Sequence, residues 1–235
     1  MAKTTFKRKP NTAKEETTET STEVAVPETS DMGAYNSPGG SGWETTDIRI
    51  PYLSLVQKTG SMADAFDKGS FVFNKELQIS DGKEPVEITI LRADKYFVED
   101  IEFDPDIRPK KFNTRDEFLA EGFSLDYEAE MKVKEAAELV VLLPVDEEYS
   151  TFSHDGGAFV RAAWICQSSA YATVGRTVAT AMIAGHLRDG VHKGKWALTS
   201  EMRSNKKASW YVPIIRSLGR HDKDFLSFVE EQAIV

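Results

Sequence analysis

Residues that could perform catalysis are scattered through this sequence. His154, His186, His192 and His221 include no pair at the spacing of a zinc-binding helix. No segment has the form GxxxxGK(S/T) that cradles phosphates, and no Ser/His/Asp arrangement can be picked out. A single cysteine, Cys166, rules out an internal disulfide framework and a thiolate metal cage made by one chain. The sequence therefore predicts a protein that is not an enzyme and that uses no cofactor or metal.

Acidic side chains are dense in one short stretch. They are Glu99, Asp100, Glu102, Asp104 and Asp106. Carboxylate oxygens suit Mg²⁺, so a magnesium-dependent nuclease is one reading of this stretch. We favour a solvated acidic loop, because nothing in the sequence marks which of these carboxylates would converge.

Basic side chains dominate a later part of the chain. Between residues 161 and 220 only Asp189 and Glu201 are acidic, against ten bases: Arg161, Arg176, Arg188, Lys193, Lys195, Arg203, Lys206, Lys207, Arg216 and Arg220. A local field of this sign attracts a polyanion, and the attraction weakens steeply with salt as condensed counterions are released. The sequence thus indicates binding of nucleic acid.

The chain as a whole is nevertheless acidic, with a formal net charge of -9. Residues 44–150 hold 13 Lys or Arg against 25 Asp or Glu, whereas residues 151–235 hold 11 against 7. This asymmetry leaves an alternative open. The chain could be a protein-interaction or virion-associated module whose acidic half is the working surface and whose basic half docks on an acidic partner.

Two alternating runs around the loop Ser204–Ala208 predict a β-hairpin. A loop of two or four residues would place Trp210 opposite Arg203. A five-residue loop pairs Met202 with Trp210 and Leu198 with Ile214, so matching of the apolar faces selects the odd loop. In this register Lys206 and Lys207 lie at an exposed tip.

The same register sorts the aromatic rings. Trp196 and Trp210 share the face that carries Leu198, which predicts that both are core residues. Tyr211 falls on the opposite face beside Arg203, where a ring next to a guanidinium could stack on an unpaired base. The predicted nucleic-acid contacts are therefore a stacking Tyr211 and seven phosphate-binding bases: Arg176, Arg188, Lys193, Lys195, Arg203, Lys206 and Lys207.

The chain divides into an arm and one folded domain. Residues 1–43 are rich in Thr, Glu, Ser, Pro and Lys and predict a disordered arm. Residues 44–235 predict a single α+β domain, mainly β. Its expected strands are 71–73, 85–91, 139–143 and 158–167. One helix is expected to begin at Thr114, a second at Ser169, and a third is expected at 224–235. The segment 51–57 is predicted to be a short helix or turn.

The chain shows no membrane or secretion signal. No run approaches the roughly 18 to 20 apolar residues that a membrane-spanning helix requires, and the polar N-terminus lacks the apolar core of a signal peptide. We therefore expect a soluble, cytoplasmic protein.

Four segments follow one another in a recognisable order. They are Ile-Pro-Tyr-Leu-Ser-Leu-Val-Gln at 50–57, Lys-Gly-Ser-Phe-Val-Phe at 68–73, Ser-Ser-Ala-Tyr-Ala-Thr-Val-Gly-Arg at 168–176, and the hairpin from Trp-Ala-Leu-Thr-Ser to Trp-Tyr-Val-Pro. This order resembles that of bacteriophage single-stranded-DNA-binding proteins. The similarity covers about residues 48–217. It implies an OB-like antiparallel barrel with inserted helices that binds DNA in a groove and catalyses no reaction.

The resemblance sets the functional expectation. We expect a single-stranded DNA-binding protein that acts in phage DNA replication, recombination or repair, with phage or host replication proteins and further copies of the chain as partners. One departure concerns the C-terminus. Proteins of this type often end in a flexible acidic tail, whereas residues 224–235 read as a short amphipathic helix, so recruitment of partners through a tail is not expected.

Overall fold

The computed structural model describes residues 51–102 and 107–233. The predicted arm at 1–43, Asp104 and Asp106 lie outside the described residues. The strands are β1 (Leu53–Leu55), β2 (Phe71–Phe73), β3 (Leu77–Ser80), β4 (Val86–Glu99), β5 (Lys111–Phe112), β6 (Val133–Pro144), β7 (Phe152–His154), β8 (Gly157–Gln167), β9 (Gly194–Ser204) and β10 (Ser209–Arg220). The longer helices are α1 (Arg115–Ala120), α2 (Arg176–Ile183) and α3 (Lys223–Phe228).

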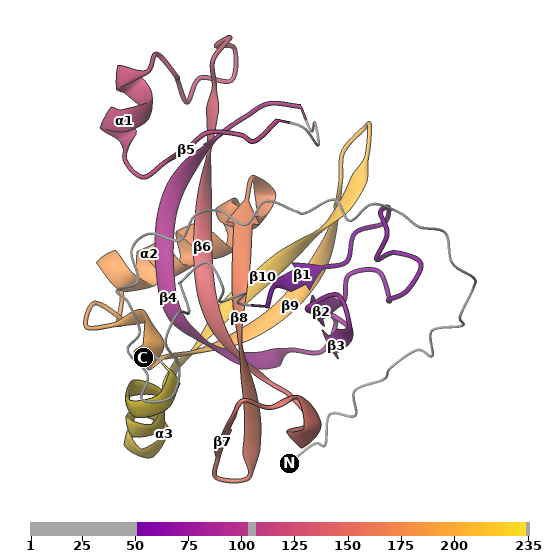
Figure 1. The fold of residues 1–235 in the computed structure, drawn as a ribbon, viewed down its shortest axis with the longest axis vertical. Helices are drawn as coiled ribbons and strands as arrows, with labels where there is room; N and C mark the ends of the chain where they lie inside the picture. Colours follow the sequence, from indigo (N-terminus) through magenta and orange to yellow (C-terminus); the bar gives the residue numbers. More distant parts are fainter. Residues whose placement is uncertain (1–50, 103–106, 234–235) are drawn as a thin grey trace, which may run out of the picture.

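Antiparallel sheets dominate the fold, which confirms the mainly-β expectation (Figure 1). The large sheet has the order β10-β9-β4-β6-β8-β7, with β5 paired to β4, and the small sheet has the order β1-β2-β3. Within the described residues no pairing joins β7 to β10. The large sheet is therefore open in the described part of the chain, where the barrel implied by the resemblance is not found as a closed sheet.

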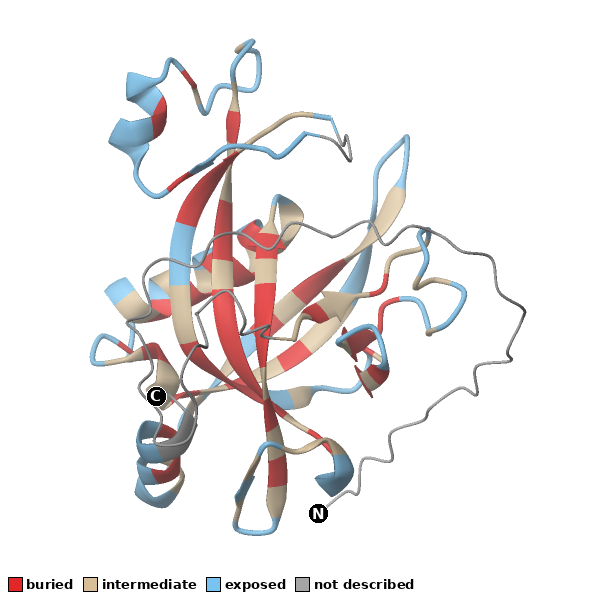
Figure 2. Cartoon of the chain, viewed as in Figure 1, coloured by how far each residue is buried: buried red, intermediate tan, exposed pale blue. Residues whose placement is uncertain are grey.

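Strand β6 runs through the middle of the large sheet and is covered on both faces. Leu139, Val141 and Leu143 enter the largest apolar cluster on one side, while Val140 and Leu142 enter a second cluster on the other. Burial of both faces explains why this predicted strand has a continuous apolar sequence without alternation. Figure 2 shows the buried residues concentrated along the central strands.

Helix α2 and the π-helical turn Tyr171–Gly175 pack on the first face and confirm the helix expected after Ser169. Glycine inside a helix is unfavourable by about 1 kcal/mol relative to alanine. Here it is required by packing, because a Cβ on Gly175 would lie only 2.5 Å from the ring of Tyr171.

Helix α3 covers the second face near the C-terminus and continues as a π-helical turn, Val229–Ala233. The Asp222 side chain caps it by accepting the Phe225 N–H at 2.9 Å. Phe225, Phe228 and Val229 pack against the β6 residues of this face. The helix predicted at 224–235 is thus present over the described residues 223–233, and residues 234–235 lie outside the described part of the chain.

Residues 107–132, here called the β5–β6 arm, pair with β4 through β5 and then extend beyond the rest of the large sheet (Figure 1). Thr114 accepts the Glu117 N–H and begins α1, as predicted from the sequence. The arm has its own apolar cluster, in which Phe112, Phe118 and Phe123 surround Phe97 of β4. It is therefore packed separately from the main core.

The segment 51–57 was predicted to be a short helix or turn, and this prediction is wrong. Leu53 pairs with Phe73 in the small sheet. At one end of the segment the Pro51 carbonyl accepts the Ala163 N–H on the free edge of β8. At the other end the Gln57 side chain bonds to Tyr211 on β10. Pairing at both ends makes the extended conformation the stable one.

The described part of the chain contains no helix that is both long and apolar enough to span a bilayer.

Candidate nucleic-acid interface

The β9–β10 hairpin carries the site predicted from the sequence, but its register differs from the prediction. Ser204 pairs with Ser209 and Arg203 with Trp210, so the connecting loop has four residues, 205–208. The five-residue loop with Met202 opposite Trp210 was wrong.

Hydrogen bonds within the loop explain the register. The Asn205 side chain accepts the N–H groups of Lys207 and Ala208, both at 2.8 Å, and the Asn205 N–H donates to the Ala208 carbonyl. Burial exerts little influence here, because Met202 is 54% exposed. The turn chemistry therefore outweighs the apolar matching that favoured the odd loop.

The shift by one residue exchanges the roles of two rings. Trp196 is fully buried in the main core, as predicted. Trp210 was also predicted to be a core residue, but it is only half-buried and lies opposite Arg203 on the same face of the hairpin. Trp210, and not Tyr211, is thus the ring beside the arginine.

Tyr211 lies on the other face, opposite Met202. Its ring covers Gly69, where an added Cβ would lie 2.6 Å from the tyrosine Cε1 atom. The Gln57 side chain donates to the Tyr211 carbonyl and accepts the Tyr211 N–H, each at 3.0 Å. Tyr211 therefore holds the hairpin against the small sheet, and the predicted position beside Arg203 is wrong.

The hairpin tip, residues 201–210, is rich in unpaired positive charge. Arg203, Lys206 and Lys207 are exposed, and within the described residues none of them forms an ion pair. The one acid of the tip, Glu201, is also exposed. Lys58 adds a further base, since its Nζ donates to the Ser209 hydroxyl.

The base of the hairpin has a different electrostatic character. Asp189 accepts from Arg220 at 2.5 Å and from Lys193 at 3.2 Å, and these two hydrogen bonds hold the pKa of its carboxyl well below the usual range. Lys195 lies 3.2 Å from a carboxylate oxygen of Glu87. Lys193, Lys195 and Arg220 at this end are therefore each paired with a carboxylate of the chain.

The remaining two predicted contacts also lie away from the tip. Arg188 donates to the Ala184 carbonyl at 3.5 Å. Arg176 pairs with Glu135 at 3.0 Å on the helical face of the sheet. Burial alone would raise the pKa of Glu135, but hydrogen bonds from Lys95 and Arg176 lower it.

The predicted contacts therefore do not form one patch. Arg203 lies eight positions beyond Lys195 along β9, which is about 26 Å at the rise of an antiparallel strand. The structure brings together Arg203, Lys206 and Lys207, and it separates them from Arg176, Arg188, Lys193 and Lys195.

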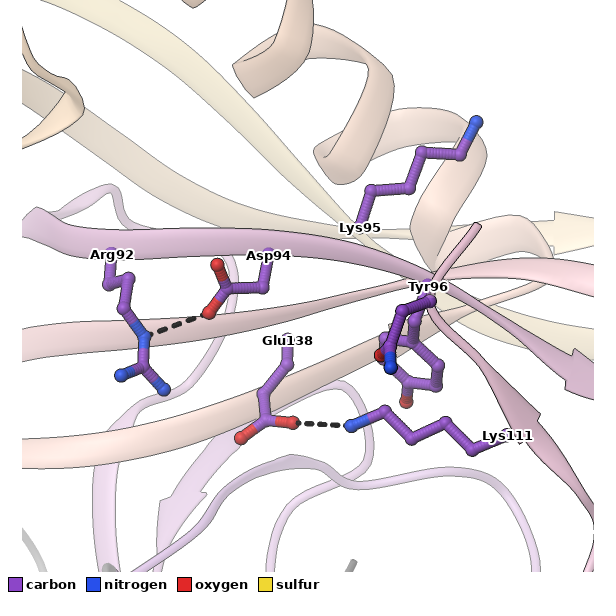
Figure 3. Close-up of a pocket in the computed structure, with 7 residues that line it drawn as sticks. Arg92, Asp94, Lys95, Tyr96, Lys111 and Glu138 are labelled. Carbon is purple, nitrogen blue, oxygen red and sulfur yellow. Dashed lines mark hydrogen bonds and ion pairs between the residues drawn. The ribbon is translucent and has the colours of Figure 1, made fainter. Parts of the chain in front are cut away.

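A second group of ionisable residues lines a small pocket on β4, β5 and β6 (Figure 3). Arg92 lies 2.8 Å from Asp94, and Lys111 lies 3.4 Å from Glu138 and over the ring of Tyr96. Burial and the nearby Glu138 raise the pKa of the Tyr96 hydroxyl. The space of about 40 Å³ suits a water molecule and is too small for a nucleobase.

The acidic stretch at 99–106 offers little support for a magnesium site. Asp100 pairs with Lys134, and the Glu99 carboxylate accepts the Lys110 N–H. Among the residues that the structure describes, no three His, Cys, Asp or Glu side chains come together as potential metal ligands.

Comparison with known proteins gives no family assignment. No protein-family model, curated protein or solved structure matches this chain.

Proposed function

We propose that the chain is a non-catalytic protein that binds single-stranded DNA through the tip of the β9–β10 hairpin. One observation carries the proposal: the hairpin tip holds three exposed cations that have no carboxylate partner among the described residues, and one of them, Arg203, lies opposite the half-exposed Trp210. The proposed setting is phage DNA replication, recombination or repair in the cytoplasm of the host bacterium.

The chemistry of the tip suits both parts of a nucleotide. Arg203, Lys206 and Lys207 have their charge available for phosphate oxygens, because binding does not require them to leave an internal partner. Trp210 supplies an aromatic ring on which an unpaired base can stack, and stacking of this kind contributes roughly 1 to 3 kcal/mol per base. A single strand offers both groups at once.

The barrel architecture implied by the resemblance remains part of this proposal. The support is the segment 51–58, which bonds to Ala163 on β8 and to Ser209 and Tyr211 on β10. The segment thereby spans the opening between two strands that lie on opposite sides of the large sheet. We propose that this arrangement is an OB-like barrel closed by β1 and not by direct pairing of the end strands.

Binding of the full chain to fluorescein-labelled single-stranded oligonucleotides tests the proposed function. Fluorescence anisotropy at about 50 mM salt should show saturable binding, which weakens steeply toward about 200 mM. A duplex of the same length should bind more weakly, because its bases cannot stack on Trp210. Absence of affinity for single strands at the lower salt concentration would end the proposal.

The alternative of a protein-interaction or virion-associated module is tested by the same protein. Co-purification from expressing cells with and without nuclease separates the two readings. Partners that disappear after nuclease treatment support DNA binding, and partners that remain support the alternative.

A further inference from the structure

The β5–β6 arm ends in an acidic loop, residues 125–131, that presents apolar side chains to solvent. Leu125, Tyr127 and Met131 are 42%, 83% and 45% exposed. They alternate with Asp126, Glu128 and Glu130, all of which face solvent at least in part. This composition is the one found at protein–protein contact surfaces, where apolar groups are surrounded by charge.

The acidic loop is ordered by contacts that leave its acidic groups available. Ser124 pairs with Lys132 at the base of the loop, and the Lys132 ammonium lies 5.0 Å above the Tyr127 ring. Within the described part of the chain, no cation pairs with the carboxylates of Glu128 and Glu130. The loop is therefore a preformed surface whose negative charge is available to another molecule.

The hairpin tip is complementary to this loop in charge and in apolar character. It carries the exposed Lys206 and Lys207, the exposed Met202 on one face of the hairpin and the half-exposed Trp210 on the other. Figure 1 shows the arm and the hairpin both extending toward the upper end of the view, separated from each other. Each can therefore meet a counterpart on another molecule.

We propose that two copies of this chain associate through a two-fold axis that sets the acidic loop of each copy on the hairpin tip of the other. Because both surfaces project toward one end of the molecule, the same rotation forms both contacts at once. Each contact joins two lysines of one copy to two glutamates of the other. The occupant of the acidic loop is thus a second copy of the chain.

The proposed dimer does not require DNA binding, but it uses the same two lysines. Lys206 and Lys207 cannot bind a partner's carboxylates and a phosphate backbone at the same time. If the proposed function also holds, a single-stranded oligonucleotide should therefore dissociate the dimer.

Light scattering after size-exclusion chromatography tests the association at a fixed concentration of the full chain. The dimer mass expected at about 50 mM salt should fall to the monomer mass at about 500 mM, because screening weakens exposed charge pairs. The double variants E128K/E130K and K206E/K207E should each be monomeric at low salt. An equimolar mixture of the two should regain the dimer mass, since both variants together restore one complementary contact of reversed sign and one of the original sign.

The variant E147K/E148K is the matched control, because it reverses two exposed charges elsewhere and should remain dimeric. Circular dichroism verifies that each variant is folded. A wild-type monomer at low salt would overturn the inference, as would a dimer that survives both charge reversals or a mixture that stays monomeric. The proposed function is judged separately, because E128K/E130K should still bind single-stranded oligonucleotides.

Discussion

The two ends of the β9–β10 hairpin have similar compositions and opposite environments. Near its base, Trp196 is buried, and Lys195 pairs with Glu87. At its tip, Trp210 is half-exposed, and Lys206 has no ionic partner within the described residues. A basic residue and an aromatic residue that are close in the sequence can therefore stabilise the fold at one end of the hairpin and remain available for binding at the other.

The buried ring should give the largest effect on stability. Trp196→Ala should lower the free energy of unfolding by about 3 to 5 kcal/mol, because it removes a fully buried aromatic side chain and leaves a cavity. Urea denaturation followed by circular dichroism measures the loss. A decrease in the free energy of unfolding below about 1 kcal/mol would show that the base of the hairpin contributes little to the stability of the fold.

The exposed ring should affect binding instead. Trp210→Ala should weaken the affinity for a single-stranded oligonucleotide by about 1 to 3 kcal/mol, while the midpoint of urea unfolding changes little. Trp210→Phe keeps an aromatic surface and should recover much of the affinity. If Tyr211→Ala reduces affinity and Trp210→Ala does not, the assignment of the stacking ring is wrong.

The contribution of the base of the hairpin to stability should also depend on pH. Burial lowers the pKa of His221 below its ordinary value of 6.5, and the ring bonds to Thr89 Oγ1 at 2.8 Å. The unfolded chain then binds a proton more readily than the folded chain, so stability is lost as the pH falls below about 6.5. His221 changes the free energy of unfolding by at most about 1.4 kcal/mol per pH unit.

Urea unfolding between about pH 7.5 and pH 5 measures this slope, with His221→Gln as the control. The variant should lose stability less steeply than the wild type over this range. Equal slopes for the two proteins would contradict the assignment to His221.

Local sequence patterns predicted much of the fold. The apolar run at 139–143 marked a central strand, and Thr114 with acids in the first turn marked a helix. The hairpin and its exposed lysines were also recognised. These features depend on residues that are close in the sequence, where periodicity and capping act.

The features that the sequence did not reveal depend on distant partners or on turn chemistry. The bonds between Gln57 and Tyr211 join residues 154 positions apart, and the pairing of Arg220 with Asp189 needs the folded chain. Asn205 did offer a signal, since asparagine side chains often close turns by accepting nearby N–H groups. This turn signal favours the four-residue loop, which places Trp210 beside Arg203.

The most direct test of the account compares two pairs of lysines on the same hairpin. Lys206→Ala/Lys207→Ala and Lys193→Ala/Lys195→Ala each remove two positive charges, but only the second pair is held by carboxylates, those of Asp189 and Glu87. The tip variant should lower the slope of log affinity against log salt for a single-stranded oligonucleotide by at most about 0.7 for each phosphate that is no longer bound. The base variant should leave the slope unchanged. Equal slopes for the tip variant and the wild type, or an equal decrease for both variants, would contradict the claim that the hairpin tip binds DNA.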